Sequence, residues 1–427
     1  MSRLRSPKSR SFFLPPAEYR RPLAAGAGLF VASWVLLSYV PAFSVWLYGD
    51  VRFYENWGSM IAAHLVPYRD FRIEYPPGAL ITFVAPTYLR KLAGYHGTYY
   101  EWFRVQILVI GLLAELAMAW TLAFLGATRR RAYAALCLAG VAPALLGPIA
   151  LSRFDYWPAL VAAAAVCALA ARRPVLACGF AAVGGVVKVY PLVLVPIALL
   201  ELWRRGGSRA VARGVALTVA VAAALAGPLT AAAPHGVAWA LHRQSVRPLQ
   251  VESLGAMFFA VAHEIANVHL HVVKSAGSDN LVGSGPHLAV TLSNVATVLA
   301  LLAVYALYAR SDQTREQAVI ACAAAVTAYI AFSKVFSPQY LVWLAPLVPL
   351  VGGRRGVRAG VLLAVVLGMT QIWEPYRYGD YFKLHTPWLT WLVVTRDLLV
   401  VALVVVLVLP LLRRNAEQLD PVRAPVV

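Results

Sequence analysis

The chain alternates between long apolar runs and short segments that carry most of its charges. Several windows hold ~20 mostly apolar residues, enough for a helix to cross a hydrocarbon core of ~30 Å. The runs are continuous and do not alternate with a period of two, which favours helices over strands. Because every backbone polar group inside a bilayer must pair within the structure, the pattern predicts an all-α polytopic membrane protein.

Basic clusters between the apolar runs predict the topology, because cytoplasmic loops of membrane proteins are enriched in Lys and Arg. Residues 1–22 and 413–427 are expected to be cytoplasmic tails, and residues 23–412 a single transmembrane domain. If all the basic clusters lie inside, the full-length spans are 23–47, 103–126, 132–151, 156–171, 209–230, 288–309, 318–334, 339–352, 357–374 and 388–412. Two shorter helices within 174–203 bring the total to about twelve spans.

Residues 174–203 are expected to form two short helices that meet at a break. Both flanks are basic, and the stretch is too short for two full spans and too long for one. Pro191 removes a backbone donor and disfavours helix at the residue before it, so Lys188 and Tyr190 should lie at the apex. Irregular backbone at membrane depth is tolerated where it is buried in protein or lines a wet cavity. The alternative is one long tilted helix that places Arg204 outside.

Two long loops are predicted on the external side. Loop 48–102 is expected to contain an interfacial or re-entrant helix near 78–93. Loop 231–287 includes an apolar stretch, 253–266, that is expected to dip into the membrane. The sequence therefore places long connections on one side of the bilayer and short basic ones on the other.

Composition supports a membrane protein and argues against a nucleic-acid partner. Hydrophobic residues make up 60% of the 427 residues and charged residues 13%, whereas a soluble domain has about 25% charged residues. The net charge of +19 comes mainly from short loops, where basic residues act as topology signals. Arg outnumbers Lys by 32 to 6, as a GC-rich bacterial genome would give, so a bacterial plasma membrane is expected. The four cysteines lie in apolar stretches and are expected to be free.

Acidic residues are concentrated on the predicted external side, where 12 of the 19 fall. The same side keeps cations that the charge rule disfavours there: Arg52, Arg153, Lys188, Arg243, Arg247 and Lys334. Charges near hydrocarbon are costly and are usually paired or functional. The external face is therefore expected to form a chamber for a polar, anionic ligand, and salt bridges between long loops are the alternative explanation.

Short motifs on this face carry a resemblance to a known family. They are Tyr48-Gly49-Asp50, Pro67-Tyr68-Arg69-Asp70-Phe71, Glu74-Tyr75-Pro76-Pro77, Arg153-Phe154-Asp155, Lys188-Val189-Tyr190-Pro191, Arg247 with Glu252-Ser253, and Ser337-Pro338-Gln339-Tyr340. In this order, over about residues 30–410, they resemble glycosyltransferase family 87 of the GT-C superfamily, the bacterial α-mannosyltransferases that use polyprenyl-phosphate-mannose. The resemblance implies a GT-C fold, an external active site, a lipid-phosphate sugar donor and inversion at the anomeric carbon.

The residues are compatible with that chemistry. A carboxylate must take the proton of the attacking hydroxyl, and Asp50 is the candidate base, with a structural salt bridge as the alternative. Cations must receive the leaving phosphate as its charge develops. The expected substrate- and phosphate-binding residues are Lys188, Arg247, Arg153, Asp155, Glu252, Lys334, Gln339 and Tyr190. For Asp155, pairing with Arg153 or capping the helix that starts at Tyr156 would explain the residue as well.

No cofactor or metal is expected, because the nine histidines show no metal-ligand spacing. The expected partners are a polyprenyl-phosphate sugar, a glycolipid acceptor and the lipid bilayer. The donor sugar is expected to be mannose, with glucose or arabinose as alternatives. A transporter or flippase of a lipid-linked sugar is the rival class, since broken helices also occur in transporters. The lack of an inverted repeat and the gathering of charges on one face weigh against that rival.

Overall fold

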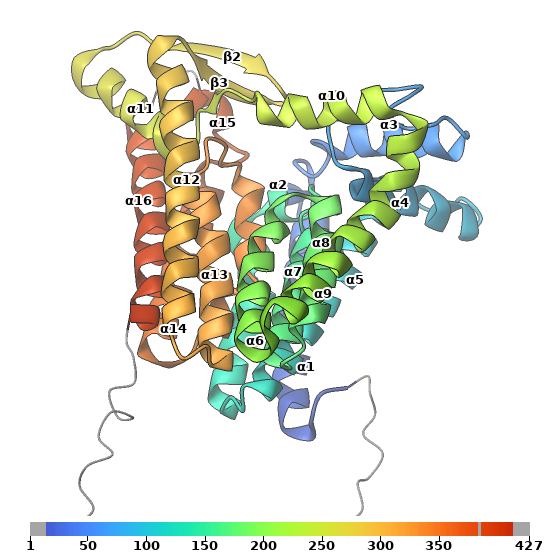
Figure 1. Ribbon diagram of the computed structural model, residues 1–427. Helices are drawn as coiled ribbons and strands as arrows, with labels where there is room; N and C mark the ends of the chain where they lie inside the picture. The colour runs from blue at the N-terminus through green and yellow to red at the C-terminus, as the bar shows by residue number, and fades with distance from the viewer. Residues whose placement is uncertain (1–13, 383–385, 413–427) are drawn as a thin grey trace, which may run out of the picture.

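The computed structural model describes residues 14–382 and 386–412, and it confirms an all-α polytopic membrane protein (Figure 1). Of the predicted tails 1–22 and 413–427, residues 1–13 and 413–427 lie outside the described residues, and helix α1 already begins at Ala17. Among the described residues, seven helical segments are long and apolar enough to cross a membrane. They are α1 (Ala17–Tyr39), α5 (Tyr99–Phe124), α9 (Val195–Ala232) with the turn η3 (Tyr190–Leu194), α12 (Ser284–Arg310), α13 (Arg315–Phe332), α14 (Gly353–Trp373) and α16 (Pro387–Val408) with η6 (Leu409–Leu412).

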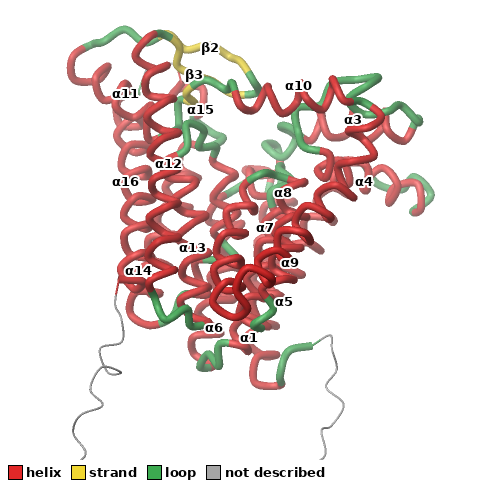
Figure 2. Tube along the Cα trace, viewed as in Figure 1, coloured by secondary structure: helices red, strands yellow, loops and turns green. Residues whose placement is uncertain are grey.

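Shorter elements complete the bundle and cover one of its ends. Within the bundle lie α6 (Arg129–Leu146), α7 (Tyr156–Ala170), α8 (Pro174–Val187) and the 3₁₀ turns η2 (Pro148–Ala150), η4 (Pro338–Leu344) and η5 (Val348–Leu350). Across the end lie α2 (Pro41–Ser44), α3 (Val51–Ala62), η1 (Pro77–Ala79), α4 (Leu80–Leu92), α10 (Pro234–Ser245), α11 (Leu254–Ala266) and α15 (Tyr378–Phe382). The described strands gather at this same end (Figure 2). They are β1 (Leu249–Gln250), β2 (His271–Ser275) and β3 (Ser278–Val282) in the antiparallel order β1-β3-β2.

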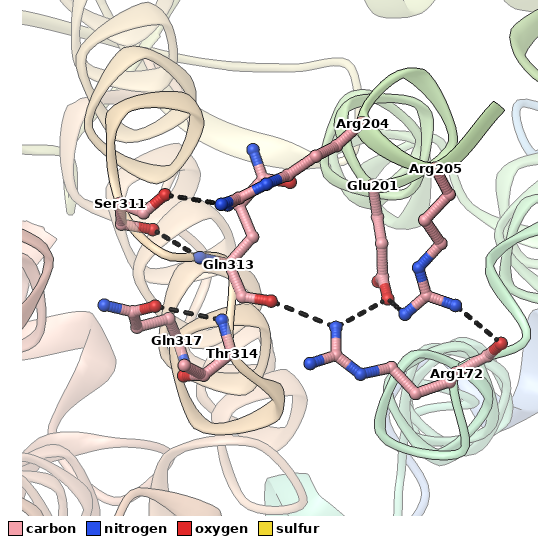
Figure 3. Close-up of polar contacts among 8 residues, drawn as sticks. All are labelled: Arg172, Glu201, Arg204, Arg205, Ser311, Gln313, Thr314 and Gln317. Carbon is pink, nitrogen blue, oxygen red and sulfur yellow. Dashed lines mark hydrogen bonds and ion pairs between the residues drawn. The ribbon is translucent and has the colours of Figure 1, made fainter. Parts of the chain in front are cut away.

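The basic loops lie together at the opposite end of the bundle. Arg131 at the start of α6 donates to the Glu316 carboxylate at 2.8 Å and also to the Leu350 carbonyl. Arg204 in α9 donates to the Ser311 carbonyl, in the α12–α13 loop, at 3.2 Å (Figure 3). These contacts show that basic loops which the sequence predicts on a single side of the membrane lie together at one end of the bundle.

The break in residues 174–203 is confirmed. Helix α8 ends at Val187, Lys188 is extended, and η3 starts α9. The chain can fold back tightly here because Gly184 and Gly185 have no side chain. An added Cβ would lie 2.6 Å from Pro191 at Gly184 and 2.5 Å from Leu192 at Gly185. Arg172 before α8 and Arg205 in α9 both bind Glu201, so both flanks return to one end (Figure 3). The alternative of one long tilted helix is wrong.

Several predicted boundaries need correction. The first span ends at Tyr39 and not at residue 47, because Pro41 starts a separate short helix. The predicted span 339–352 consists of 3₁₀ turns rather than α-helix. Helix α9 joins two predicted helices through a kink at Gly206 and Gly207, where the backbone leaves helical geometry. Within loop 231–287, the three-stranded sheet was not predicted.

Small residues bring the central helices together. In α1 and α6, the backbones approach so closely that a Cβ on Gly140 would lie 2.4 Å from the Gly26 carbonyl oxygen. Helix α13 is rich in alanine and almost wholly buried. Close backbone approach of this kind is the usual way that membrane helices gain packing energy without a hydrophobic driving force. This packed centre supports the chain segments that carry the polar residues described next.

Candidate functional site

Asp50 and Arg153 form an ion pair at the end of the bundle that carries the long loops. Asp50 precedes α3 and its side chain makes no hydrogen bond to the helix, so it is available to Arg153, whose Nε lies 3.1 Å away. Gly49 permits this approach, since a Cβ there would lie 2.9 Å from Arg153 Nη1. Asp50 thus pairs with Arg153 and not with Arg52, and its side chain stays 34% exposed, which leaves one edge open to a ligand.

A second ion pair joins Lys188 to Asp155. The Lys188 ammonium lies 2.6 Å from Asp155 Oδ1, and the same oxygen accepts the indole N–H of Trp343 at 2.6 Å. The ammonium also lies 5.0 to 5.1 Å from the ring centres of Phe154, Tyr340 and Trp343. Cation–π contacts of this kind stabilise a desolvated cation. Asp155 makes no capping bond to α7 and pairs with Lys188 rather than Arg153, so both alternatives for Asp155 are wrong.

The aromatic wall beside Lys188 follows from local geometry. Tyr340 and Trp343 lie three residues apart in the 3₁₀ turn η4, and residues at that spacing eclipse one another. Their rings stack with centres 4.1 Å apart. On its other side Trp343 stacks on Tyr190 at 3.8 Å, and Tyr190 is only 1% exposed. Tyr190 was predicted to bind substrate, but its burial favours a role in supporting Trp343.

Two further cations approach this region from the loops around the sheet. Arg247 donates through Nη2 to the Ser278 hydroxyl at 2.9 Å. Lys334 donates to the Ser245 carbonyl at 2.6 Å, and its own carbonyl accepts from the Gln250 amide at 3.0 Å. Both cations follow helices directly, α10 for Arg247 and α13 for Lys334, which fixes where their side chains start.

The cations act on one another electrostatically. Burial lowers the pKa of the Lys188 ammonium, and the charges of Arg247 and Arg153 act in the same direction, while Asp155 opposes them. Burial and the charge of Arg247 also lower the pKa of Lys334. Like charges this close favour a bound anion, because an anion relieves their repulsion. The predicted chamber for an anionic ligand therefore has a physical basis in Lys188, Arg247 and Lys334.

Glu252 occupies a different environment. Its carboxylate accepts a hydrogen bond from the Gln250 side chain, and its backbone carbonyl accepts from Arg396 Nη2 at 3.1 Å. Arg396 in turn pairs with Asp397 at 2.9 Å, and both are buried within α16. Burial raises the pKa of Glu252. Among the described residues no ion pair joins Glu252 to Arg153, Lys188, Arg247 or Lys334. Glu252 is therefore better explained as a residue that packs the loop than as one that binds the ligand.

The remaining predicted motifs have local structural roles. Gln339 accepts the Ser337 hydroxyl at 2.7 Å at the start of η4. Asp70 pairs with Arg69 at 2.9 Å on an exposed turn. Glu74 pairs with Arg243 of α10 at 3.2 Å and braces that helix against the loop before α4. The alternative explanation, salt bridges between long loops, therefore accounts for this part of the external charge.

A cavity of about 360 Å³ lies beside the Asp50–Arg153 pair. Its walls come from the chain after α1, the turn before α7 and the end of α14. The lining residues are Val45, Trp46, Tyr48, Gly49, Arg52, Ile149, Ser152, Arg153, Glu374 and Pro375. Burial raises the pKa of Glu374 to about 7, with the charge of Arg153 lowering it and the charge of Asp50 raising it.

Sequence reasoning missed Trp343 and Glu374. For Trp343 the signal was its three-residue spacing from Tyr340, which is recognised only if the segment is known to form a 3₁₀ helix. For Glu374 the signal was its position as the last residue of the predicted span 357–374, at the external end. Spacing alone could not show that Glu374 and Arg153 line one cavity, since that depends on how α14 packs against α6.

The described residues hold no candidate metal site, and comparison of the sequence with known proteins identifies no family. Within the described ranges, no three His, Cys, Asp or Glu side chains gather as they would around a metal ion. The sequence matches no protein-family model and no curated protein. Function is therefore inferred from the residues and their geometry.

Proposed function

We propose that the protein is a membrane glycosyltransferase of the GT-C type. It would move a hexose, with mannose as the first candidate, from a polyprenyl-phosphate sugar to a hydroxyl of a glycolipid acceptor. One observation carries the proposal: the tripeptide Arg153-Phe154-Asp155 holds Asp50 on one side and Lys188 on the other. A single rigid turn thus sets a candidate base next to a candidate phosphate-binding cation, as sugar transfer from a phosphate donor requires.

In the proposed reaction the acceptor hydroxyl oxygen bonds to the anomeric carbon as the bond from that carbon to the phosphate oxygen breaks. The electron pair of the broken bond stays on the phosphate, and Asp50 takes the hydroxyl proton. Lys188, Arg247 and Lys334 stabilise the added phosphate charge. One displacement with one base inverts the anomeric carbon. The resemblance to glycosyltransferase family 87 supports this assignment, because its motifs supply Asp50, Lys188 and Arg247.

The proposal includes an orientation in the membrane. The end with the basic loops would face the cytoplasm of a bacterial plasma membrane, and the end with Asp50 and the sheet would face outside. A lipid-phosphate donor suits this arrangement. Its chain would stay in the bilayer, and its phosphate and sugar would reach the cations at the outer end.

The decisive experiment incubates purified protein with polyprenyl-phosphate-mannose and a mannosylated lipid acceptor, followed by mass spectrometry. The proposal predicts an acceptor heavier by one hexose and release of polyprenyl phosphate. Parallel vesicles with fluorescent polyprenyl-phosphate-mannose test the rival class. Transfer of the lipid between leaflets without a hexose product would show that the protein is a flippase and not a glycosyltransferase.

A further inference from the structure

The cavity beside Arg153 has the lining of a sugar site. Trp46 and Tyr48 offer exposed aromatic faces, with 43% and 46% of their surface accessible, against which the apolar face of a hexose ring can lie. Arg52, Arg153 and Glu374 offer charged donors and acceptors for hydroxyl groups. Its volume falls in the range of about 300–1,000 Å³ typical of small-molecule pockets.

The position of the cavity distinguishes the two sugars of the proposed reaction. Gly49 and Arg153 line it, and Arg153 pairs with Asp50, so a ligand there lies next to the candidate base. The cations Lys188 and Lys334 do not line it. Arg153 in its wall is already paired with Asp50, and the carboxylate of Glu374 would repel a phosphate. A neutral hydroxylated group fits this cavity better than the phosphate of the donor.

We infer that this cavity binds the sugar of the acceptor, and that Glu374 and Arg153 hold its hydroxyls so that the reacting hydroxyl reaches Asp50. The inference rests on the proposed glycosyl transfer and names a substrate-binding residue, Glu374, which follows the end of α14 and lies outside the resemblance motifs. Near neutral pH Glu374 exchanges a proton readily, so it can either donate to or accept from a hydroxyl. Trp46 is held for stacking by an edge contact with Tyr376 at 5.7 Å.

Steady-state kinetics test the assignment. The assay uses octyl α-mannoside as the acceptor, a short polyprenyl-phosphate-mannose as the donor, and a detergent without a sugar headgroup. Glu374→Ala should raise the KM for octyl α-mannoside about 10- to 100-fold, since hydrogen bonds to a charged group are lost, and leave the KM for the donor unchanged. Glu374→Gln should recover part of the loss. Asp380→Asn, an exposed acid in the same segment, is the matched control.

A binding measurement separates this inference from the proposed reaction. Saturation-transfer NMR with octyl α-mannoside, and octyl α-glucoside for comparison, needs no turnover. Binding by the wild type that is lost in a well-folded Glu374→Ala variant supports the sugar site even if no hexose is transferred, in which case only the glycosyltransferase proposal fails. Transfer with an unchanged acceptor KM in Glu374→Ala, or a change confined to the donor KM, overturns the inference.

Discussion

The Lys188 ammonium lies 2.6 Å from the Asp155 carboxylate, and neither side chain can be removed without leaving a buried charge. Asp155 is 1% exposed and the Lys188 side chain 16%. Removing one partner of a buried pair costs roughly 3–5 kcal/mol, because the other charge stays uncompensated. Lys188→Ala alone therefore mixes a loss of stability with a loss of donor binding.

A double variant separates these effects. Lys188→Met should lower the melting temperature and raise the KM for the donor. Adding Asp155→Asn removes the orphaned charge and keeps an oxygen for the Trp343 indole, so the melting temperature should recover while the donor KM stays high. Thermal melting and donor titration on the same samples measure both. Recovery of donor affinity in the double variant would exclude Lys188 from phosphate binding.

Asp50→Asn should retain the fold and lose turnover. The substitution keeps the size of the side chain and removes its capacity to take a proton. The rate should fall about 10²- to 10⁴-fold, the usual contribution of a general base, with the donor KM little changed. Asp70→Asn, in an exposed ion pair with Arg69, is the control. If a well-folded Asp50→Asn enzyme worked within a few-fold of the wild type, Asp50 would be only the ion-pair partner of Arg153.

Glu374 should make stability depend on pH. Burial raises its pKa from an ordinary 4.5 to about 7, so between these values the folded chain holds a proton that the unfolded chain has lost. The contribution of Glu374 to the free energy of unfolding is therefore greatest below pH 4.5, and it falls as the pH rises toward and through 7. Glu374→Gln cannot ionise, so its melting temperature should rise relative to that of the wild type between pH 5 and pH 8. A difference that stays constant over that interval would contradict the prediction.

Glu201 should matter for stability and not for turnover. Its carboxylate is 2% exposed and binds Arg172 at 2.9 Å as well as Arg205. Glu201→Gln should cost about 1–3 kcal/mol, since two guanidiniums lose a charged partner. The melting temperature should drop while the rate per folded molecule stays near that of the wild type. A matched fall in the rate would show coupling between this end of the bundle and the catalytic end.

Cysteine labelling tests the orientation. Arg130→Cys should resist an impermeant maleimide in intact cells, whereas Lys274→Cys on β2 should react. The native cysteines lie in apolar helices. Any labelling of them is measured in the parental protein without an added cysteine and is subtracted. Labelling at position 130 from outside would show that the proposed orientation in the membrane is wrong.

The sequence predicts most of the membrane helices, because hydrophobic length acts locally, and its basic residues predict which loops lie together. It also predicts the break at Lys188, since Pro191 and the two glycines force it. Asp50, Arg153, Lys188 and Asp155 were named from sequence, but their partners were not. Asp155 is predicted to bind substrate, with pairing to Arg153 or capping of a helix as alternatives, whereas it binds Lys188 and Trp343, contacts that depend on how α7, η3 and η4 pack. Long-range packing of this kind leaves no periodic trace in the chain.

The contact between Arg131 and Glu316 has a consequence for biogenesis. A chain emerging from the ribosome inserts α6 long before residue 316 is made, and Leu350, the other partner of Arg131, comes later still. Until then the basic loop that begins α6 lacks the partners that join it to the second half of the chain. The closing of that end of the bundle is set by the last third of the polypeptide. Truncation there should expose the early helices to quality-control proteases rather than leave a smaller folded unit.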